Sequence, residues 1–142
     1  MSTLQKSDWF SESLFQVGSN IFVFGSNLAG RHGAGAAKFA LAYCGAQYGN
    51  GFGLQGQSFA IPTKDEFLRV LPLEMIEQHV RQFIHFAVQN PSLTFYITPI
   101  GTGLAGYQDH QIAPMFRDVP ANCILPDKWK VQELPLFLDK SV

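Results

Sequence analysis

The residues whose types and spacing could support ligand binding or catalysis lie in two glycine-rich segments of this sequence. Residues 25–35 read GSNLAGRHGAG and residues 99–107 read PIGTGLAGY. Glycine lets the backbone approach a ligand closely, and a glycine-rich loop that leads into a helix brings backbone N–H groups and the positive end of the helix dipole together. Such a loop favours binding of an anion such as a diphosphate. A tight turn has the same composition, and the first segment matches neither the GxxxxGK[ST] nor the GxGxxG pattern.

Few ionisable residues accompany these loops. Arg31 and His32 lie in the first loop, and Asp109 and His110 follow the second. The neutral polar side chains of the two loops are those of Ser26, Asn27, Thr102 and Tyr107. No serine lies in a GxSxG pattern, and no histidine pair has zinc-ligand spacing. This set of side chains is better suited to binding a diphosphate than to catalysing a difficult reaction. In such a site an asparagine would contact a ribose and an aromatic ring would stack on a ring or sugar of the ligand.

Alternating strands and helices must position the two loops. We predict strands at residues 21–24, 59–61, 93–98 and 122–125, and helices from residue 36, over 73–89 and over about 109–116. The glycine-rich stretch 45–58 predicts a loop. This alternation is typical of parallel strands with right-handed crossovers and helices on both faces of the sheet. Ligands of such sheets bind outside the carboxyl ends of the strands, where both glycine-rich loops begin. We therefore expect the two loops to line one cleft.

The composition predicts a single soluble domain over residues 1–142. An apolar fraction of 46% supplies a core for a chain of 142 residues. Ten basic and eleven acidic residues give a net charge of −1. The chain therefore lacks the excess of positive charge that is typical of general nucleic-acid-binding proteins. No apolar run approaches the roughly 18 residues of a membrane span, and the N-terminus lacks a signal core, so we expect a cytoplasmic protein without a membrane partner. We expect Cys44 and Cys123 to be free buried thiols, and the sequence predicts no metal site and no cofactor.

The pair of loops resembles the two ligand loops of macro domains. Residues 25–27 followed by residues 33–35 and a helix of small residues are similar to the first loop of that family, and residues 100–107, IGTGLAGY, are similar to the second. The resemblance covers about residues 20–125. It implies a three-layer α/β/α fold with a mostly parallel, mixed central sheet. It also implies binding of ADP-ribose or a related nucleotide diphosphate-sugar, free or attached to ADP-ribosylated macromolecules.

The resemblance implies a role for each part of the two loops. Asn27 corresponds to the asparagine that contacts a ribose, and residues 33–35 would line the distal-ribose and diphosphate side. Residues 101–105 would wrap the diphosphate with main-chain N–H groups, and Tyr107 corresponds to the aromatic residue near the distal ribose. The ligand-binding residues expected on this basis are Gly25, Ser26, Asn27, Arg31, Gly33, Ala34, Gly35, Gly101, Thr102, Gly103, Leu104, Ala105, Gly106 and Tyr107.

The sequence departs from the family pattern in three places. The acidic residue that reads the adenine amino group near the start of the domain has no clear counterpart, since Asp8 is the only early aspartate. Arg31 and His32 stand where glycines are common. Residues 36–38, Ala-Ala-Lys, replace the acidic pair expected of poly(ADP-ribose) glycohydrolases. The resemblance therefore implies a divergent macro-like domain and argues against that glycohydrolase mechanism.

Three functions remain open from the sequence. The chain binds ADP-ribose or a related nucleotide; or it hydrolyses ADP-ribosyl bonds or ADP-ribose 1″-phosphate on the same scaffold; or it is an interaction module without a nucleotide ligand. For a hydrolase the catalytic candidates are Asn27, His32 and Asp109, with His32 or Asp109 as base and Arg31 stabilising developing charge. The alternative is a solvated Arg31-His32 pair at a loop tip and an aspartate favoured at a helix N-terminus by the dipole.

Overall fold

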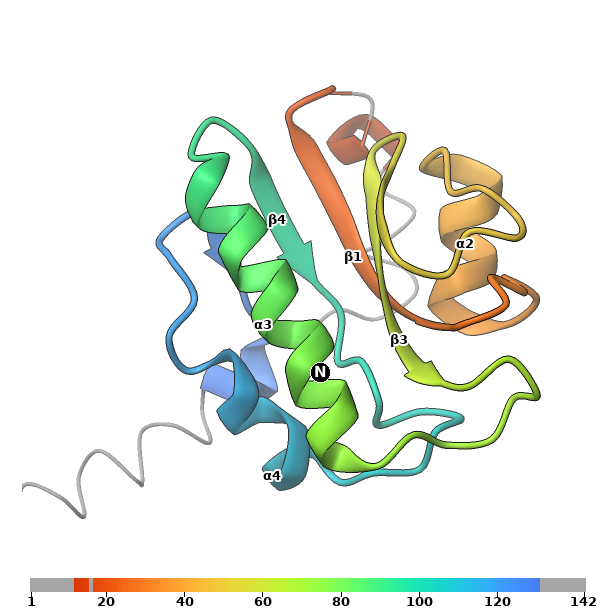
Figure 1. Cartoon of the computed structure of the whole chain (residues 1–142). Helices are drawn as coiled ribbons and strands as arrows, with labels where there is room; N and C mark the ends of the chain where they lie inside the picture. The colour runs from red at the N-terminus through yellow and green to blue at the C-terminus, as the bar shows by residue number, and fades with distance from the viewer. Residues whose placement is uncertain (1–11, 16, 131–142) are drawn as a thin grey trace, which may run out of the picture.

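A computed structural model describes residues 12–15 and 17–130 of the chain (Figure 1). Its strands are β1 (Asn20–Asn27), β2 (Gly53–Gln55), β3 (Ser58–Lys64), β4 (Thr94–Ile97) and β5 (Cys123–Ile124). Its α-helices are α2 (Gly35–Tyr43), α3 (Leu73–Gln89) and α4 (Asp109–Ile112), and its 3-10 helices are η1 (Glu12–Phe15) and η2 (Ala113–Phe116). The four predicted strands and three predicted helices are all present, with α4 and η2 dividing the third helix.

The five strands form one mixed sheet in the order β2-β3-β1-β4-β5. Strand β1 pairs in parallel with β3 on one side and β4 on the other, and β4 pairs in parallel with β5. Within this sheet of described strands, the one antiparallel pairing of strands joins β2 to β3. An α/β fold with a mostly parallel, mixed sheet is therefore confirmed. The prediction of a loop over 45–58 was incomplete, because Gly53–Gln55 forms the edge strand β2.

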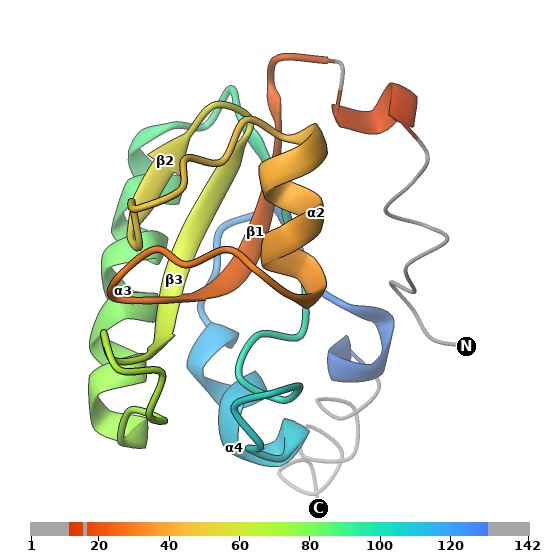
Figure 2. The ribbon, with the colours of Figure 1, turned by 90° about the vertical axis from the view of Figure 1, so that its right-hand side faces the viewer.

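Successive residues of β1 alternate between two apolar clusters, because side chains of a strand point to opposite faces of the sheet. Ile21 and Val23 belong to the cluster on the α3 face, and Phe22 and Phe24 to the cluster on the α2 face. Figure 2 shows α2 and α3 on opposite sides of the sheet. All four side chains are buried, so β1 is the central strand of both clusters.

Helix α3 forms where the sequence places apolar residues at helical spacing. Its buried residues are Ile76, Val80, Phe83 and Ala87, which fall on one face of the helix. Pro72 caps its start with an extended backbone, and the Asn90 side chain donates to the Phe86 carbonyl oxygen at 2.8 Å at its end. The predicted bounds 73–89 are those observed, because the sequence carries both the periodic face and the two end signals.

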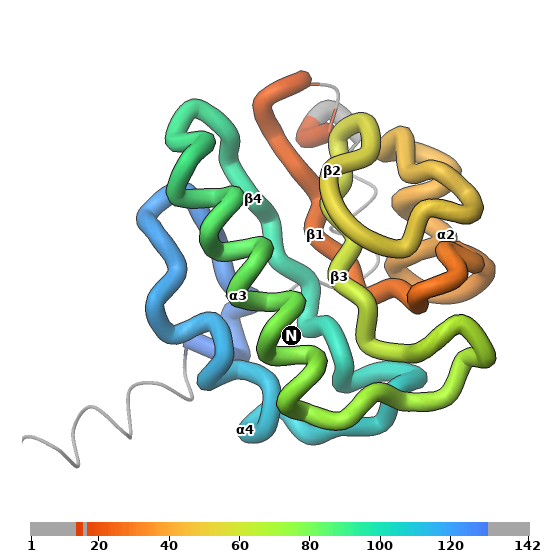
Figure 3. Tube along the Cα trace, in the orientation of Figure 1, coloured from red at the N-terminus to blue at the C-terminus, as the bar shows by residue number. Residues whose placement is uncertain are grey.

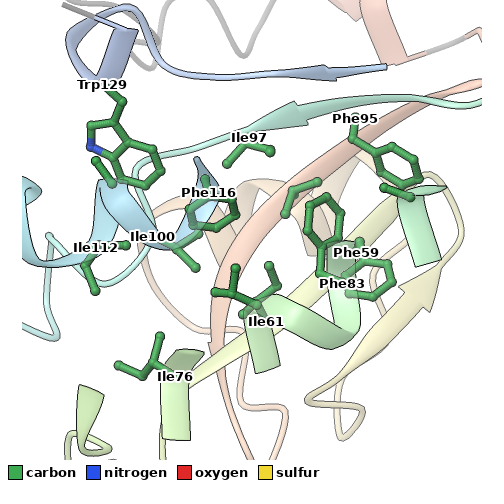
Figure 4. Packing of buried hydrophobic residues seen from close by; sticks show 14 of the residues in the cluster. Phe59, Ile61, Ile76, Phe83, Phe95, Ile97, Ile100, Ile112, Phe116 and Trp129 are labelled. Carbon is green, nitrogen blue, oxygen red and sulfur yellow. The ribbon is translucent and has the colours of Figure 1, made fainter. Parts of the chain in front are cut away.

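Phe83 joins α3 to the sheet through aromatic contacts (Figure 4). Its ring lies edge-on to Phe59 of β3 at 5.1 Å and to Phe95 of β4 at 5.3 Å between ring centroids. Edge-to-face pairs of this kind add to the free energy of burial. Phe116 of η2 and Trp129 continue the same cluster, with ring centroids 5.3 Å apart. The cluster fixes α3 and η2 against strands whose carboxyl ends carry the glycine-rich loops.

We predict that Phe83→Ala lowers the free energy of unfolding by about 3–5 kcal/mol, because it leaves a cavity between α3, β3 and β4. Urea denaturation followed by circular dichroism measures this loss. Val88→Ala is the matched control on the same helix, since Val88 is 58% exposed, and it should change stability by less than about 0.5 kcal/mol. Equal losses in the two variants would contradict the assignment of Phe83 to the core.

Candidate functional site

The carboxyl ends of β1, β3 and β4 lie at one edge of the sheet, because the three strands run in parallel (Figure 3). The segments that follow these strands line a cleft of about 480 Å³. That volume lies within the range of about 300–1,000 Å³ that is typical of small-molecule sites. The expected convergence of the two glycine-rich loops on one cleft is thus observed, and a third segment, after β3, joins them.

Most of the predicted ligand-binding residues line this cleft. The lining includes residues 25–27, Arg31, 33–35 and 101–105. Gly106 and Tyr107 are predicted members that do not line it. The residues that line the cleft without having been predicted are Ala36, Ala37, Thr63, Lys64, Leu68, Thr98 and Pro99. These additional residues come from the end of β3, the segments that follow β3 and β4, and the start of α2. Their sequence shows no motif that would predict a binding site.

Asn27 organises the loop that follows β1. Its side-chain Nδ2 donates to the Arg31 carbonyl oxygen at 3.0 Å, and its Oδ1 accepts the Arg31 backbone N–H at 2.9 Å. The amide thus closes a local turn, as asparagine commonly does. Asn27 also lines the cleft, and a carboxamide has a second N–H and a second lone pair. Asn27 can therefore also contact a ligand, although its side chain already makes two hydrogen bonds to the Arg31 backbone.

His32, predicted as a base for a hydrolase, does not line the cleft. Its side chain is 1% exposed, its Nε2 is 3.0 Å from the Asn50 carbonyl oxygen, and its ring lies edge-on to Phe24. A carbonyl oxygen accepts hydrogen bonds, so Nε2 carries the proton. The Nδ1 of His32 has no hydrogen-bond partner among the described residues. His32 fastens the first loop to the segment before β2.

Asp109, the other predicted base, pairs with side chains outside the cleft. Its Oδ1 accepts the Trp129 indole N–H at 2.8 Å, and its Oδ2 lies 3.2 Å from the Lys128 ammonium nitrogen. It is the first residue of α4 and does not line the cleft. A carboxylate at the start of a helix interacts favourably with the dipole. Asp109 therefore fastens the segment around Trp129 to α4.

Tyr107 ties two of the cleft-forming segments together instead of facing the cleft. Its hydroxyl donates to the Leu71 carbonyl oxygen at 2.7 Å, and its ring packs against the α3-face cluster. Leu71 follows β3, whereas Tyr107 follows β4. The contact of this aromatic ring with a ligand stays a prediction, and Tyr107 does not line the cleft. The hydrogen bond sets the spacing of the two segments.

Backbone N–H groups without an acceptor gather at the cleft from two segments. At the start of α2, the N–H groups of residues 34–37 have no acceptor among the described residues, and Lys38 is the first whose N–H is bonded, to the Ala34 carbonyl oxygen at 3.2 Å. In the second loop the same holds for Gly101 and residues 103–105. The start of α2 adds the positive pole of the helix dipole. The residues that carry these donors line the same cleft, and unbonded N–H groups in such numbers suit an anion.

The hydroxyl groups that line the cleft already donate to backbone carbonyls. The donors are Ser26, Thr63, Thr98 and Thr102, and their acceptors are the carbonyl oxygens of Gly51, Ser26, Val23 and Pro99. A hydroxyl has one proton to donate, so none of these side chains has one left for a ligand. The side chains that keep free donors for a ligand are therefore the charged ones and, in part, Asn27.

Arg31 and Lys64 are the charged side chains that line the cleft, and no carboxylate lines it within the described residues. Neither cation forms an ion pair there. The adjacent carboxylate, Asp65, is occupied by Arg69 at 3.1 Å, and the backbone N–H of Arg69 holds the pKa of Asp65 below its usual range. Lys64 also pairs with Asn27 across the β1–β3 ladder, so both cations lie beside Asn27. The cleft is electropositive.

Other chemistry has little support within the described residues. Burial raises the pKa of both cysteine thiols to about 12, so neither is a thiolate nucleophile at neutral pH. No group of three or more histidine, cysteine or acidic side chains is arranged to hold a metal in the part of the chain that the structure describes. Asp8, the early aspartate, lies outside the described residues. No helix of residues 12–15 and 17–130 is long and apolar enough to cross a membrane.

Comparison of the chain with models of known protein families, with curated proteins and with solved structures finds no match. The function must therefore be argued from the cleft itself.

The first loop rests on Gly51, which approaches it more closely than any side chain would permit. A Cβ at this position would lie 2.2 Å from the Asn27 carbonyl oxygen and 2.9 Å from that of Leu28. The Gly51 carbonyl oxygen also accepts the Ser26 hydroxyl. The glycine therefore fixes the end of β1, from which the cleft is built.

We predict that Gly51→Ala lowers the free energy of unfolding by about 1–3 kcal/mol, because the added methyl group displaces the backbone at the end of β1. Thermal and urea unfolding measure the loss. Gly18→Ala is the control, since a Cβ there meets nothing within 4 Å, and it should shift stability by less than about 0.5 kcal/mol. A Gly51→Ala protein as stable as the control would show that this close approach is unimportant.

Proposed function

We propose that this chain is a macro-like domain that binds ADP-ribose or a related nucleotide diphosphate-sugar in the cleft between its two glycine-rich loops. The observation that carries the proposal is that the backbone N–H groups of residues 34–37, of Gly101 and of residues 103–105 have no acceptor among the described residues and belong to residues that line one cleft. The three-layer arrangement and the relation to macro domains, implied by the sequence of the loops, belong to the same proposal.

A diphosphate matches the donors of this cleft. It carries about two negative charges and several acceptor oxygens, and backbone N–H groups at a helix start and in a glycine-rich loop recognise such oxygens without side chains. Arg31 and Lys64 add positive charge, and no described carboxylate opposes them. A ligand without an anionic group would leave these donors unmatched, at a cost of about 1–3 kcal/mol for each buried group.

Binding is favoured over hydrolysis by the positions of the titratable groups. General-base catalysis needs a base within hydrogen-bond reach of the attacking water. The predicted bases His32 and Asp109 are bonded elsewhere, and no imidazole or carboxylate lines the cleft within the described residues. Asn27, the third catalytic candidate, lines the cleft but is bonded to the Arg31 backbone and does not titrate near neutral pH. We therefore propose that the domain recognises ADP-ribosyl groups rather than removing them.

We predict that Gly103→Val abolishes ADP-ribose binding while the fold survives. Gly103 lines the cleft, a Cβ there meets nothing within 4 Å, and its φ lies outside the left-handed region, so the valine fills ligand space without straining the protein. Isothermal titration should show measurable binding by the wild type and at least about a hundredfold weaker binding by the variant, equivalent to roughly 3 kcal/mol. Circular dichroism and thermal unfolding confirm the fold.

The matched control is Gly18→Val, a glycine with equally open surroundings that does not line the cleft. It should bind as the wild type does. Absence of ADP-ribose binding by the wild type would refute the proposed function. Normal binding by a folded Gly103→Val variant would remove the second loop from the site.

A further inference from the structure

Two exposed leucines line the cleft from different segments. Leu68 follows β3 and is 45% exposed, and Leu104 follows β4 and is 75% exposed. Apolar side chains lose favourable free energy when they stay in water. A single exposed leucine needs no explanation, but two that line one cleft give it apolar lining in addition to the anion-binding donors. We call Leu68 and Leu104 the leucine pair.

The backbone of Leu68 is strained. Its φ is +66°, and it is the one non-glycine residue with positive φ among the described residues. In this region the Cβ of an L-residue crowds the backbone, and leucine gains no compensating hydrogen bond from its side chain. Outliers of this kind persist only where the surrounding structure enforces them, and they cluster at ligand sites.

A compact network enforces the conformation. The Asp65 carboxylate accepts the backbone N–H groups of Phe67 at 2.8 Å and Arg69 at 2.9 Å, and it accepts the Arg69 Nε–H at 3.1 Å. The Leu68 N–H donates to the Asp65 carbonyl oxygen at 3.0 Å, and the Asp65 N–H donates to the Arg69 carbonyl oxygen at 2.8 Å. Every one of these bonds would remain with a glycine at position 68, so the network specifies the backbone and not the leucine.

The segment after β4 is tied to the segment after β3 by hydrogen bonds outside this network. The Tyr107 hydroxyl donates to the Leu71 carbonyl oxygen, and the Leu71 N–H donates to the Thr63 carbonyl oxygen at 2.9 Å. The two hydrogen bonds hold the segments that carry Leu68 and Leu104 at a fixed spacing. The leucine pair is therefore a preformed feature of the cleft.

We propose that the leucine pair holds the nucleobase of the ligand by its flat faces. This inference rests on the proposed function and states which part of the ligand contacts the apolar lining of the cleft. A nucleotide diphosphate-sugar contains one group with apolar faces, the base, since its riboses and diphosphate are polar throughout. No carboxylate lines the cleft within the described residues, and the lining hydroxyl protons are engaged, so neither kind of group is free to pair with the edge of the base, whereas its faces can contact the leucine pair.

The test compares two ligands that share a diphosphate and differ in the base. Leu68→Asn keeps a side chain of similar size and suits the left-handed backbone, but it removes the apolar contact. We expect the variant to bind ADP-ribose about tenfold more weakly in isothermal titration, and to bind inorganic pyrophosphate as the wild type does in ³¹P NMR titration. Its melting temperature should equal or exceed that of the wild type, because asparagine relieves the strain.

Leu104→Ser should reproduce the selective loss for ADP-ribose. Phe67→Ala is the control, since Phe67 is next to Leu68 and 69% exposed but does not line the cleft, and it should leave both affinities unchanged. An equal loss for both ligands in Leu68→Asn, or no loss for either, would overturn the base-holding role. So would a wild type that binds ADP-ribose no more tightly than pyrophosphate, an outcome that leaves the anion site standing. A wild type that binds neither ligand would refute the proposed function, and the role of the leucine pair with it.

Discussion

The parallel pairing of β1 with both β3 and β4 is the constraint on which the rest of the structure depends. It brings three carboxyl strand ends to one edge of the sheet, and the segments leaving those ends must turn there together. Because α2 starts directly after the first of these segments, its unbonded N–H groups open onto the same space as those of the second glycine-rich loop. The donors of the cleft thus arise from chain topology, and side chains mainly fix their positions.

The side chains that fix these positions act through the backbone. Asn27 binds both polar groups of the Arg31 peptide backbone, Ser26 and His32 reach the segment before β2, and Tyr107 reaches the segment after β3. From the sequence, each of these residues was predicted to contact a ligand or to act in catalysis. Polar residues that stabilise a loop and polar residues that form a binding site are of the same types, so residue type does not distinguish the two roles. Polar groups buried in loops must find partners, and here the partners are neighbouring carbonyls.

The alternation of strands and helices along the chain, the span of α3 and the convergence of the two glycine-rich loops could be predicted, because apolar periodicity and glycine spacing are local signals. The position of His32 under the loop could not, since nothing in RHG indicates whether the ring turns toward Asn50 or toward solvent. Lys64 and Leu68 were missed for a related reason. They belong to a third segment without glycine enrichment, and its place at the cleft depends on β3 lying beside β1.

The most direct test of the central claim, that backbone N–H groups from two segments bind the ligand, is an ¹⁵N–¹H NMR titration of the full chain with ADP-ribose. We expect the largest shift changes, moving with one common dissociation constant, at the amides of residues 34–37 and at those of Gly101 and residues 103–105. Amides on the exposed side of α3 should stay unchanged. Saturable changes confined to surfaces away from these two segments, or no changes at millimolar ligand, would contradict the claim.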